Sequence, residues 1–377
     1  MKIIFARSPY SIIIDEPTQA ETKLELYLWQ SDGIEPTTPT YTFSGLIPST
    51  SNRTMYYDIA NQSLEYVENI FPEYLYSVEA PTMFAYAKVK RFYKTLFGGF
   101  VPTGVDETFI IVNGYTEYMD GANFYADVPV LPLACDIVMT TPTTFTYNNT
   151  LQNMQSVPSD ISPIFQPYIN AIIQPVAGTS YYINWNNSSQ AFTNTLTLPN
   201  AVNIIKVPLD YTPSPFVDPY TVAIYSSVVA GVYDLVWYRT IVPECSPKYS
   251  PYLCSFINKY GGWENIWFLK ANEKNVTTKS TEYNLSSQEF YYNPIKGQKQ
   301  TFNTNGERTI KCNTGFVEEE IFSDMITQLL LSETILLNSL PVLVKTKSST
   351  LKSHLKEKNI NYEIEFEYKF QIINTII

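Results

Sequence analysis

The chain has 377 residues, a formal net charge of −11, and 15% aromatic residues, with 30 Tyr and 21 Phe. This length exceeds one ordinary core and predicts two or three domains, and the abundance of Tyr, Val, Ile and Thr favours strands over helices. The acidic charge repels phosphate backbones and so excludes nucleic-acid binding through a broad basic surface. The composition therefore predicts a mainly β protein with no specific nucleic-acid site.

The first region, residues 1–127, is predicted to be a β-sandwich domain because short strands alternate with turn signals every eight to twelve residues. A short helical stretch is expected around 62–70, and the basic cluster at 88–94 is interpreted as a solvated strand or turn face. The strands are expected at 12–14, 23–29, 40–43, 55–59, 83–91 and 108–115.

The second region, residues 128–243, is rich in Pro, Thr and Asn. Proline removes hydrogen-bond donors from a sheet, so only short strands are expected. The region is predicted to be a smaller β domain with strands at 181–185, 193–198, 204–207, 221–225 and 235–241.

The third region, residues 244–377, is predicted to be a β-rich domain with one helix. Residues 254–269 suit two strands around a turn at Gly261 and Gly262. About 270–306 suits a polar hairpin or arm, with turn residues at Asn293, Pro294, Gly297, Asn305 and Gly306. Apolar residues at helical spacing predict an amphipathic helix over about 316–331, capped by Asn313 or Thr314. A hairpin of two short apolar runs, 334–337 and 342–344, should follow.

The last predicted strand has the clearest pattern in the chain, because apolar and charged residues alternate strictly. The apolar side chains are expected on a buried face and the charged side chains on the opposite face. The apolar set is Tyr362, Ile364, Phe366, Tyr368 and Phe370, and the charged set is Glu363, Glu365, Glu367 and Lys369.

Motifs for catalysis or metal binding are not found. The sole histidine, His354, lies among lysines and is interpreted as an exposed loop residue. The four cysteines include no Cys-x-x-Cys pair; they are expected to be free thiols, although Cys245 and Cys254 could meet across a hairpin. No catalytic, cofactor-binding or metal-binding residue is therefore assigned.

Two groups of residues are candidates for an interface. Glu363, Glu365 and Glu367 would form either a solvated strand face or a face that meets lysines of a neighbouring subunit, and a cation site is the other interpretation of this row. Trp263 and Trp267, four residues apart, would pack in a core or an interface. Trp263 beside Glu264 would also suit a carbohydrate-binding platform or a glycosidase, but that pairing has little specificity.

The N-terminal residues 1–17 contain no signal-peptide apolar core, and no apolar run reaches the roughly 18 residues that a membrane span needs. We therefore expect a soluble protein that is made in a cytosol and does not associate with a membrane.

Several phrases of the sequence, in this order and spacing, resemble virion structural proteins of tailed phages that infect Bacteroidota, crAss-like phages included. The phrases are SPYSI, LELYLW, YDIANQSLEYVEN, CSFINKYGGWENIWFLK, ERTIKCNTGFVEEE, QLLLSETILL and NYEIEFEYKF. The resemblance covers the N-terminal region and the last third of the chain, and does not extend to about 127–244.

The resemblance implies a non-enzymatic ring protein (connector) of the neck or tail, assembled in the bacterial host cytoplasm, with a fibronectin- or immunoglobulin-like N-terminal sandwich. Its partners would be further copies of itself and other tail, neck or portal proteins. The ring would contain six or twelve copies, and DNA would pass through its lumen. Ring contacts could form by β-augmentation along exposed strand edges or the polar arm. The alternatives are a receptor- or glycan-binding adhesin on the virion surface and a polysaccharide-degrading enzyme.

Overall fold

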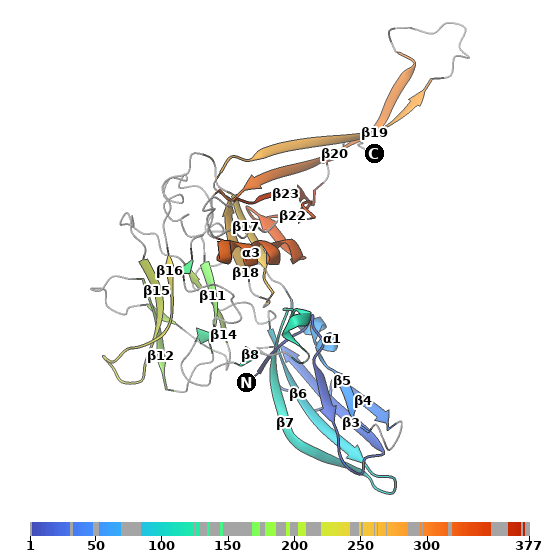
Figure 1. Ribbon diagram of the computed structural model, residues 1–377, viewed down its shortest axis with the longest axis vertical. Coiled ribbons are helices and arrows are strands. Elements are labelled where there is room, and N and C mark those ends of the chain that lie inside the picture. The colour runs from blue at the N-terminus through green and yellow to red at the C-terminus, as the bar shows by residue number, and fades with distance from the viewer. Residues whose placement is uncertain are drawn as a thin grey trace. The chain divides into compact units, whose positions relative to one another are not determined.

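A computed structural model gives a mainly β protein with several sheets and two short α-helices among the described residues (Figure 1). The chain divides into two compact units, Met1–Ser246 with Ile257–Asn265, and Pro247–Phe256 with Ile266–Ile377. The predicted three-domain division stays a prediction. The structure describes residues 2–30, 33–47, 53–68, 84–121, 123, 126–127, 134–135, 144–145, 168–173, 178–185, 194–196, 203–208, 220–241, 249, 252–259, 261, 263–268, 270–285, 295, 297–315, 319–347, 361–370 and 372–373.

The first unit begins with a six-stranded sheet in the order β4-β3-β6-β7-β1-β8, whose neighbours are antiparallel except for the parallel pair β1 and β7. The predicted strands are present, but β7 starts eight residues earlier than expected and β1 was not predicted. The strands are β1 (Lys2–Phe5), β3 (Glu21–Gln30), β4 (Tyr41–Leu46), β6 (Phe84–Lys94), β7 (Phe100–Val112) and β8 (Ala126–Asp127).

One face of this sheet is the core of the N-terminal region. Leu24, Leu26 and Leu28 of β3 alternate onto it and are buried, as the sequence predicted. A two-stranded sheet, β2 and β5, packs over them together with a short helical segment. That segment begins at Ala60, two residues before its predicted start. The covering elements are β2 (Ser11–Ile14), β5 (Met55–Asp58), α1 (Ala60–Ser63) and the 3₁₀ turn η1 (Leu64–Tyr66), and a second 3₁₀ turn, η3 (Tyr118–Asp120), follows β7.

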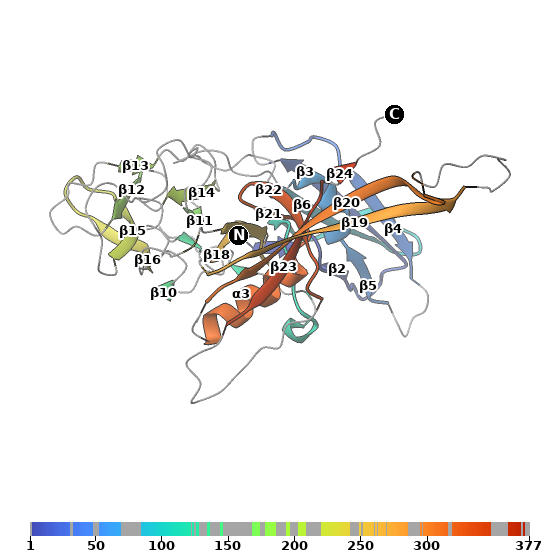
Figure 2. The same cartoon turned by 90° about the horizontal axis from the view of Figure 1, so that it is seen from above.

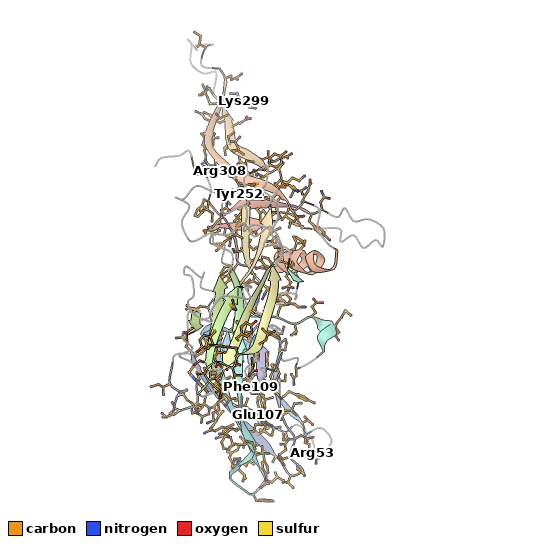
Figure 3. The ribbon with its side chains drawn as sticks, turned by 90° about the vertical axis from the view of Figure 1, so that its left-hand side faces the viewer. Arg53, Glu107, Phe109, Tyr252, Lys299 and Arg308 are labelled. Carbon is orange, nitrogen blue, oxygen red and sulfur yellow. The ribbon has the colours of Figure 1, made fainter. Side chains whose placement is uncertain are left out.

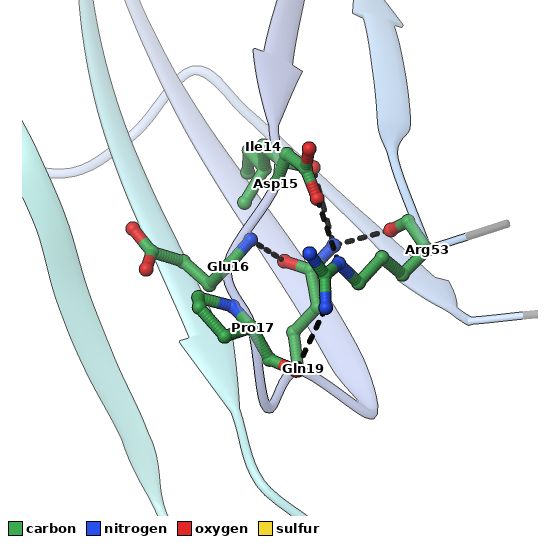
Figure 4. A network of polar contacts seen from close by, with 6 residues as sticks. All are labelled: Ile14, Asp15, Glu16, Pro17, Gln19 and Arg53. Carbon is green, nitrogen blue, oxygen red and sulfur yellow. Dashed lines mark hydrogen bonds and ion pairs between the residues drawn. The ribbon is translucent and has the colours of Figure 1, made fainter. Parts of the chain in front are cut away.

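A buried glutamine holds the turn between β2 and β3 against the segment that enters β5 (Figure 4). Gln19 donates from Nε2 to the carbonyl oxygens of Ile14 and Arg53, and its Oε1 accepts from the Glu16 amide at 3.1 Å. The Arg53 side chain donates to Asp15 and to the Pro17 carbonyl, each at 3.2 Å. The buried amide of Gln19 is thereby satisfied as both donor and acceptor.

Two further sheets lie in the Pro-rich part of the first unit, with strand orders β10-β16-β15-β12-β13 and β14-β11-β9. All five predicted strands of this region are present, whereas β9, β10 and β11 were not predicted. The strands are β9 (Ala134–Cys135), β10 (Thr144–Phe145), β11 (Tyr168–Ile173), β12 (Ser180–Trp185), β13 (Asn194–Leu196), β14 (Asn203–Pro208), β15 (Tyr220–Ser227) and β16 (Asp234–Ile241).

The second unit is organised around an eight-stranded sheet in the order β18-β17-β21-β22-β23-β20-β19, with β24 also paired to β20. The predicted strand pair, short hairpin and final alternating strand are all part of it. The final strand, however, ends at Tyr368, and Phe370, which was expected on its buried face, is exposed. The strands are β17 (Tyr252–Ile257), β18 (Trp263–Phe268), β19 (Glu273–Asn284), β20 (Lys299–Asn313), β21 (Ile335–Leu337), β22 (Leu340–Val344), β23 (Glu363–Tyr368) and β24 (Ile372–Ile373).

Helix α3 (Glu319–Leu331) confirms the predicted amphipathic helix from Glu319 onward, and Met325, Ile326 and Leu329 of its stripe are buried. The predicted cap is wrong. Asn313 ends β20, and the Thr314 hydroxyl accepts from the Tyr362 amide at 3.1 Å. Both residues therefore make contacts with the strand β23 and its flanking residue, and neither caps the helix.

The sheet curls at the end where β19 begins. The Lys274 ammonium of β19 lies 5.7 Å from the ring centroid of Tyr252, although four strands separate β19 from β17. Inside the curl, the Phe268 and Phe366 rings pack edge to face with centroids 5.7 Å apart, near the buried free thiols Cys254 and Cys312. Cys254 is therefore not bonded to Cys245, and the free-thiol expectation is confirmed for it.

Candidate functional site: an exposed hairpin arm

The longest hairpin of the second unit is formed by β19 and β20, which pair from Glu273 opposite Lys311 to Asn284 opposite Lys299. Figures 1 and 2 show these two strands running on beyond the other strands of their sheet. Figure 3 places Lys299 far out along the hairpin, with Arg308 and Tyr252 near its base. Every residue of β19 is exposed. The predicted polar arm is thus a formed hairpin.

β19 is the last strand of the sheet, and among the described strands only β20 pairs with it. Half of its backbone amide and carbonyl groups consequently point away from the sheet. Such an edge is a template for a further strand. All twelve residues of β19 are exposed, so the open edge is long for an edge strand.

A β-bulge divides the arm into two parts. The register shifts between Lys279 and Thr281, which lie opposite Asn305 and Phe302, so β20 has one more residue than β19 at this point. Asn303, inside the bulge, has a positive φ of 51°. Residues 305–306 were predicted as turn residues, but they continue β20 and pair with β24. An extra residue of this kind bends a strand without ending it.

Beyond the bulge lies the distal arm, which we define as residues 281–285 and 297–302. In the described part of the chain, this portion is a ribbon of two strands with both outer edges open. Since residues opposite one another share a face, as do alternate residues, Phe302, Tyr283 and Leu285 lie on one face. The Tyr283 and Phe302 rings are 5.6 Å apart.

The opposite face of the distal arm is polar. Glu282 lies opposite Thr301, and Asn284 lies opposite Lys299. Glu282 and Lys299 form an ion pair, so the charges of this face cancel. The distal arm therefore has one neutral polar face and one face on which the exposed Tyr283, Leu285 and Phe302 lie together with Thr281 and Gln300.

The base of the arm is joined to the sheet by lysine–glutamate pairs. The Glu307 carboxylate lies 2.7 Å from Lys279 and 3.5 Å from Lys345, and Lys345 lies 3.0 Å from Glu367. The hydrogen bond from Lys279 lowers the pKa of Glu307 below its ordinary value. Solvent-exposed pairs of this kind are individually weak, and here they connect Lys279 and Glu307 of the arm with Lys345 and Glu367 of the sheet.

The predicted glutamate row lies on β23, inside the sheet between β22 and β20. Glu363 pairs with Lys311 at 2.5 Å, and this hydrogen bond lowers the pKa of Glu363. Glu365 lies opposite Lys311 in register, and Glu367 pairs with Lys345. Lysines of the same chain thus neutralise much of the row, and an interface role for Glu363, Glu365 and Glu367 stays a prediction.

Trp263 is buried at the start of β18, whereas the side chain of Trp267 lies outside the described residues. The packing expected of Trp263 is therefore present, and interface roles for both tryptophans stay predictions. His354 and the side chain of Glu264 also lie outside the described residues. Among the described residues, no three His, Cys, Asp or Glu side chains gather as a metal site would require, and none of the described helices has the length and apolarity of a membrane span.

A second exposed surface occurs at the end of the β6–β7 hairpin in the first unit. Leu96, Phe97, Phe100 and Val101 are exposed there, and we call these four residues the hairpin tip. The Lys23 and Lys94 ammonium groups lie 5.2 Å and 5.7 Å from the Phe100 ring centroid. Sequence reasoning missed this surface because residues 95–100 look like an ordinary turn.

The predicted basic cluster, residues 88–94 of β6, precedes the hairpin tip in the chain. Lys88 pairs with Glu35 at 2.8 Å, Lys94 pairs with Glu21 at 3.1 Å, and Arg91 pairs with Glu107. The interpretation of the cluster as a charged strand face, and not as a phosphate-binding patch, agrees with this pairing.

Compared with known proteins, the chain matches no protein-family model and no curated protein.

Proposed function

We propose that this chain is a non-enzymatic structural protein of a tailed-phage virion that forms a ring in the neck or tail. Copies join through the exposed arm, whose β19 edge adds to a strand of the neighbouring copy. The N-terminal sheet with its β2–β5 cover is a fibronectin- or immunoglobulin-like sandwich in this proposal. The resemblance of the sequence phrases to virion proteins of Bacteroidota phages supports the virion assignment.

The observation that carries the proposal is the fully exposed, 12-residue edge strand β19. A two-stranded hairpin is marginally stable in water by itself, so an arm of this length is expected to gain stability from a partner. An arm on one part of a chain and an acceptor elsewhere make a heterologous contact, and such contacts form a ring where the rotation between copies closes. The net charge of −11 suits a lumen through which DNA passes without adhering.

The proposal is tested by measuring the mass of the purified full chain by native mass spectrometry, followed by electron cryo-microscopy of the species found. A closed ring, with six or twelve copies as the expected sizes, supports the proposal. A matched variant lacking residues 276–308, with a short Gly-Ser turn in their place, keeps the buried Thr309 and Ile310 of the sheet and should remain folded and monomeric.

A stable trimer would overturn the ring and favour a receptor-binding adhesin. Release of reducing sugar from a capsular or plant polysaccharide by the purified chain would overturn the non-enzymatic assignment. Particles assembled without the protein that remain complete and infectious would overturn the structural role.

A further inference from the structure

We propose that Lys274, Arg308, Tyr252 and Tyr368 form a binding site for a phosphate group at the base of the arm. Inorganic phosphate and phosphomonoesters present the same oxyanion, and experiment distinguishes these two sources. The inference goes beyond the proposed ring and does not depend on it, because the site consists of side chains on one face of the sheet and makes no use of the open backbone edge of β19.

Ion pairing separates the five basic residues of β19 and β20 into two groups. Three of them each pair with a glutamate, and these pairs are Lys279 with Glu307, Lys299 with Glu282, and Lys311 with Glu363. Within the part of the chain that the structure describes, Lys274 and Arg308 have no carboxylate partner. Two such cations are exceptional in a chain of net charge −11, and they leave positive charge for an anion from outside the chain.

The two unpaired cations lie on the same face of the sheet. Lys274 lies opposite Ile310, and Arg308 precedes Ile310 by two residues on β20. Opposite residues share a face, and so do alternate residues of one strand, so both cations lie on the side of the buried Ile310. Their sequence neighbours Glu273 and Glu307 alternate onto the other face. The carboxylates nearest in sequence therefore point away from the two cations.

The curl of the sheet adds the first tyrosine. The Lys274 ammonium lies 5.7 Å from the ring centroid of Tyr252, and its hydrogen bond with the Tyr252 hydroxyl raises the pKa of Lys274 above its ordinary value. An ammonium can only donate, so the Tyr252 oxygen accepts this bond and its own O–H is left to donate to a further acceptor. Figure 3 shows Tyr252 and Arg308 at the base of the arm.

The second tyrosine lies close to both cations. Burial raises the pKa of Tyr368 above its ordinary value, and the charges of Lys274 and Arg308 are near enough to lower it in part. The Tyr368 hydroxyl therefore stays protonated at neutral pH and can donate a hydrogen bond. An ammonium, a guanidinium and two hydroxyl groups thus gather at one place.

This set of donors fits a phosphate group. Guanidinium groups match the oxygens of phosphate and carboxylate, and an ammonium adds a point charge. A carboxylate has a single negative charge and two oxygens, whereas a phosphomonoester carries about −1.5 to −2 near neutral pH and has three terminal oxygens. Two cations and two hydroxyl donors agree with the phosphate in both charge and number of acceptors.

The first experiment titrates the full chain with inorganic phosphate by isothermal titration calorimetry, at neutral pH and low ionic strength. The wild type should bind saturably. Arg308→Met and Lys274→Met should each weaken binding by about tenfold or more, because each loses a charged hydrogen-bond donor. Tyr368→Phe, which removes only one hydroxyl, should weaken binding less than either. Circular dichroism verifies that the variants are folded.

The matched control is Lys279→Met. This variant removes one positive charge from the same strand, but from the face that carries Glu273 and Glu307, and it should bind phosphate like the wild type. Weakening by K279M as large as that by R308M would show a general effect of charge and would overturn the site. Absence of saturable phosphate binding by the wild type would overturn it as well.

The second experiment identifies the source of the phosphate by comparing inorganic phosphate, phenyl phosphate and acetate. Tighter binding of phenyl phosphate supports the site with a phosphomonoester as its ligand, and tighter or equal binding of inorganic phosphate supports it with the free ion. Acetate that binds as tightly as either phosphate would overturn the assignment of the site to phosphate.

Discussion

The Lys345 ammonium lies 3.0 Å from Glu367 of β23 and 3.5 Å from Glu307 of β20, and so one lysine joins the glutamate row to the base of the arm. The hydrogen bond with Glu367 raises the pKa of Lys345 above its ordinary value, so the lysine stays charged. The arm is thus attached through charge as well as through backbone pairing, and its attachment depends on pH.

Acid should weaken the lysine–glutamate pairs at the base of the arm and between Lys311 and Glu363. Hydrogen bonds from lysines lower the pKa values of Glu307 and Glu363 below 4.5, so their stabilisation is complete above pH 4.5 and is lost as the pH falls through the lower folded-state values. Lys311→Met should reduce this acid dependence, which urea unfolding midpoints across the acid range will measure. The exposed Lys347 provides the control variant, K347M. Identical acid dependence in the wild type and K311M would contradict the prediction.

The buried thiols of the second unit should be unreactive. Burial raises the pKa of Cys254 well above its ordinary value and that of Cys312 to about 12, and the thiolate is the reactive form. Iodoacetamide at neutral pH should label neither residue in the folded protein and both in urea, as peptide mapping will show. Rapid labelling of either residue without denaturant would be incompatible with the packing described.

Phe366 and Phe370 should differ in how much each contributes to the free energy of unfolding. Phe366 is fully buried against Phe268, whereas Phe370, four residues further along the same predicted apolar face, is 57% exposed. Phe366→Ala should lower the free energy of unfolding by about 3–5 kcal/mol, because a large cavity remains. Phe370→Ala should change it by less than about 0.5 kcal/mol. Equal losses in denaturant titrations would show that both rings are buried.

Gly261 should tolerate no side chain. It has a φ of +81°, and a Cβ atom there would lie 2.8 Å from backbone atoms of Asn113, another residue of the first unit. Gly121 has a similar φ of +82° with open space around it. Gly121→Ala should cost about 1 kcal/mol from backbone strain alone, and Gly261→Ala clearly more, measured by thermal unfolding. A smaller loss for G261A than for G121A would rule out the close approach.

Several elements were predictable because they depend on local patterns. The alternation of β3 and β23, the helical stripe of α3, and the Gly-containing turn between β17 and β18 are all visible in short windows of sequence. β1 and β11 were missed because both are short apolar runs whose pairing partners lie distant in the chain. The first half of β7 was missed because it contains Pro102 and Gly104, and it is a strand because β6 pairs along its length.

The arm, too, was predicted from the sequence in part only. Its polar composition predicted a hairpin, yet the sequence could not show that β20 continues through the expected turn at 305–306, because the bulge at Asn303 and the pairing with β24 decide it. Nor could it show that the lysines facing the glutamate row belong to the same chain. These contacts join residues more than twenty positions apart.

The sequence by itself determined that this protein is mainly β and acidic, where its amphipathic strands and helix lie, and which face of each is apolar, because alternation and helical spacing are properties of neighbouring residues. Only the tertiary structure decided which strands pair, that β19 is an open edge, that Tyr283, Leu285 and Phe302 are exposed on one face of the distal arm, and that Lys279, Lys311 and Lys345 neutralise the acidic residues around them. Those features follow from strand order and register, which are set by contacts between distant segments.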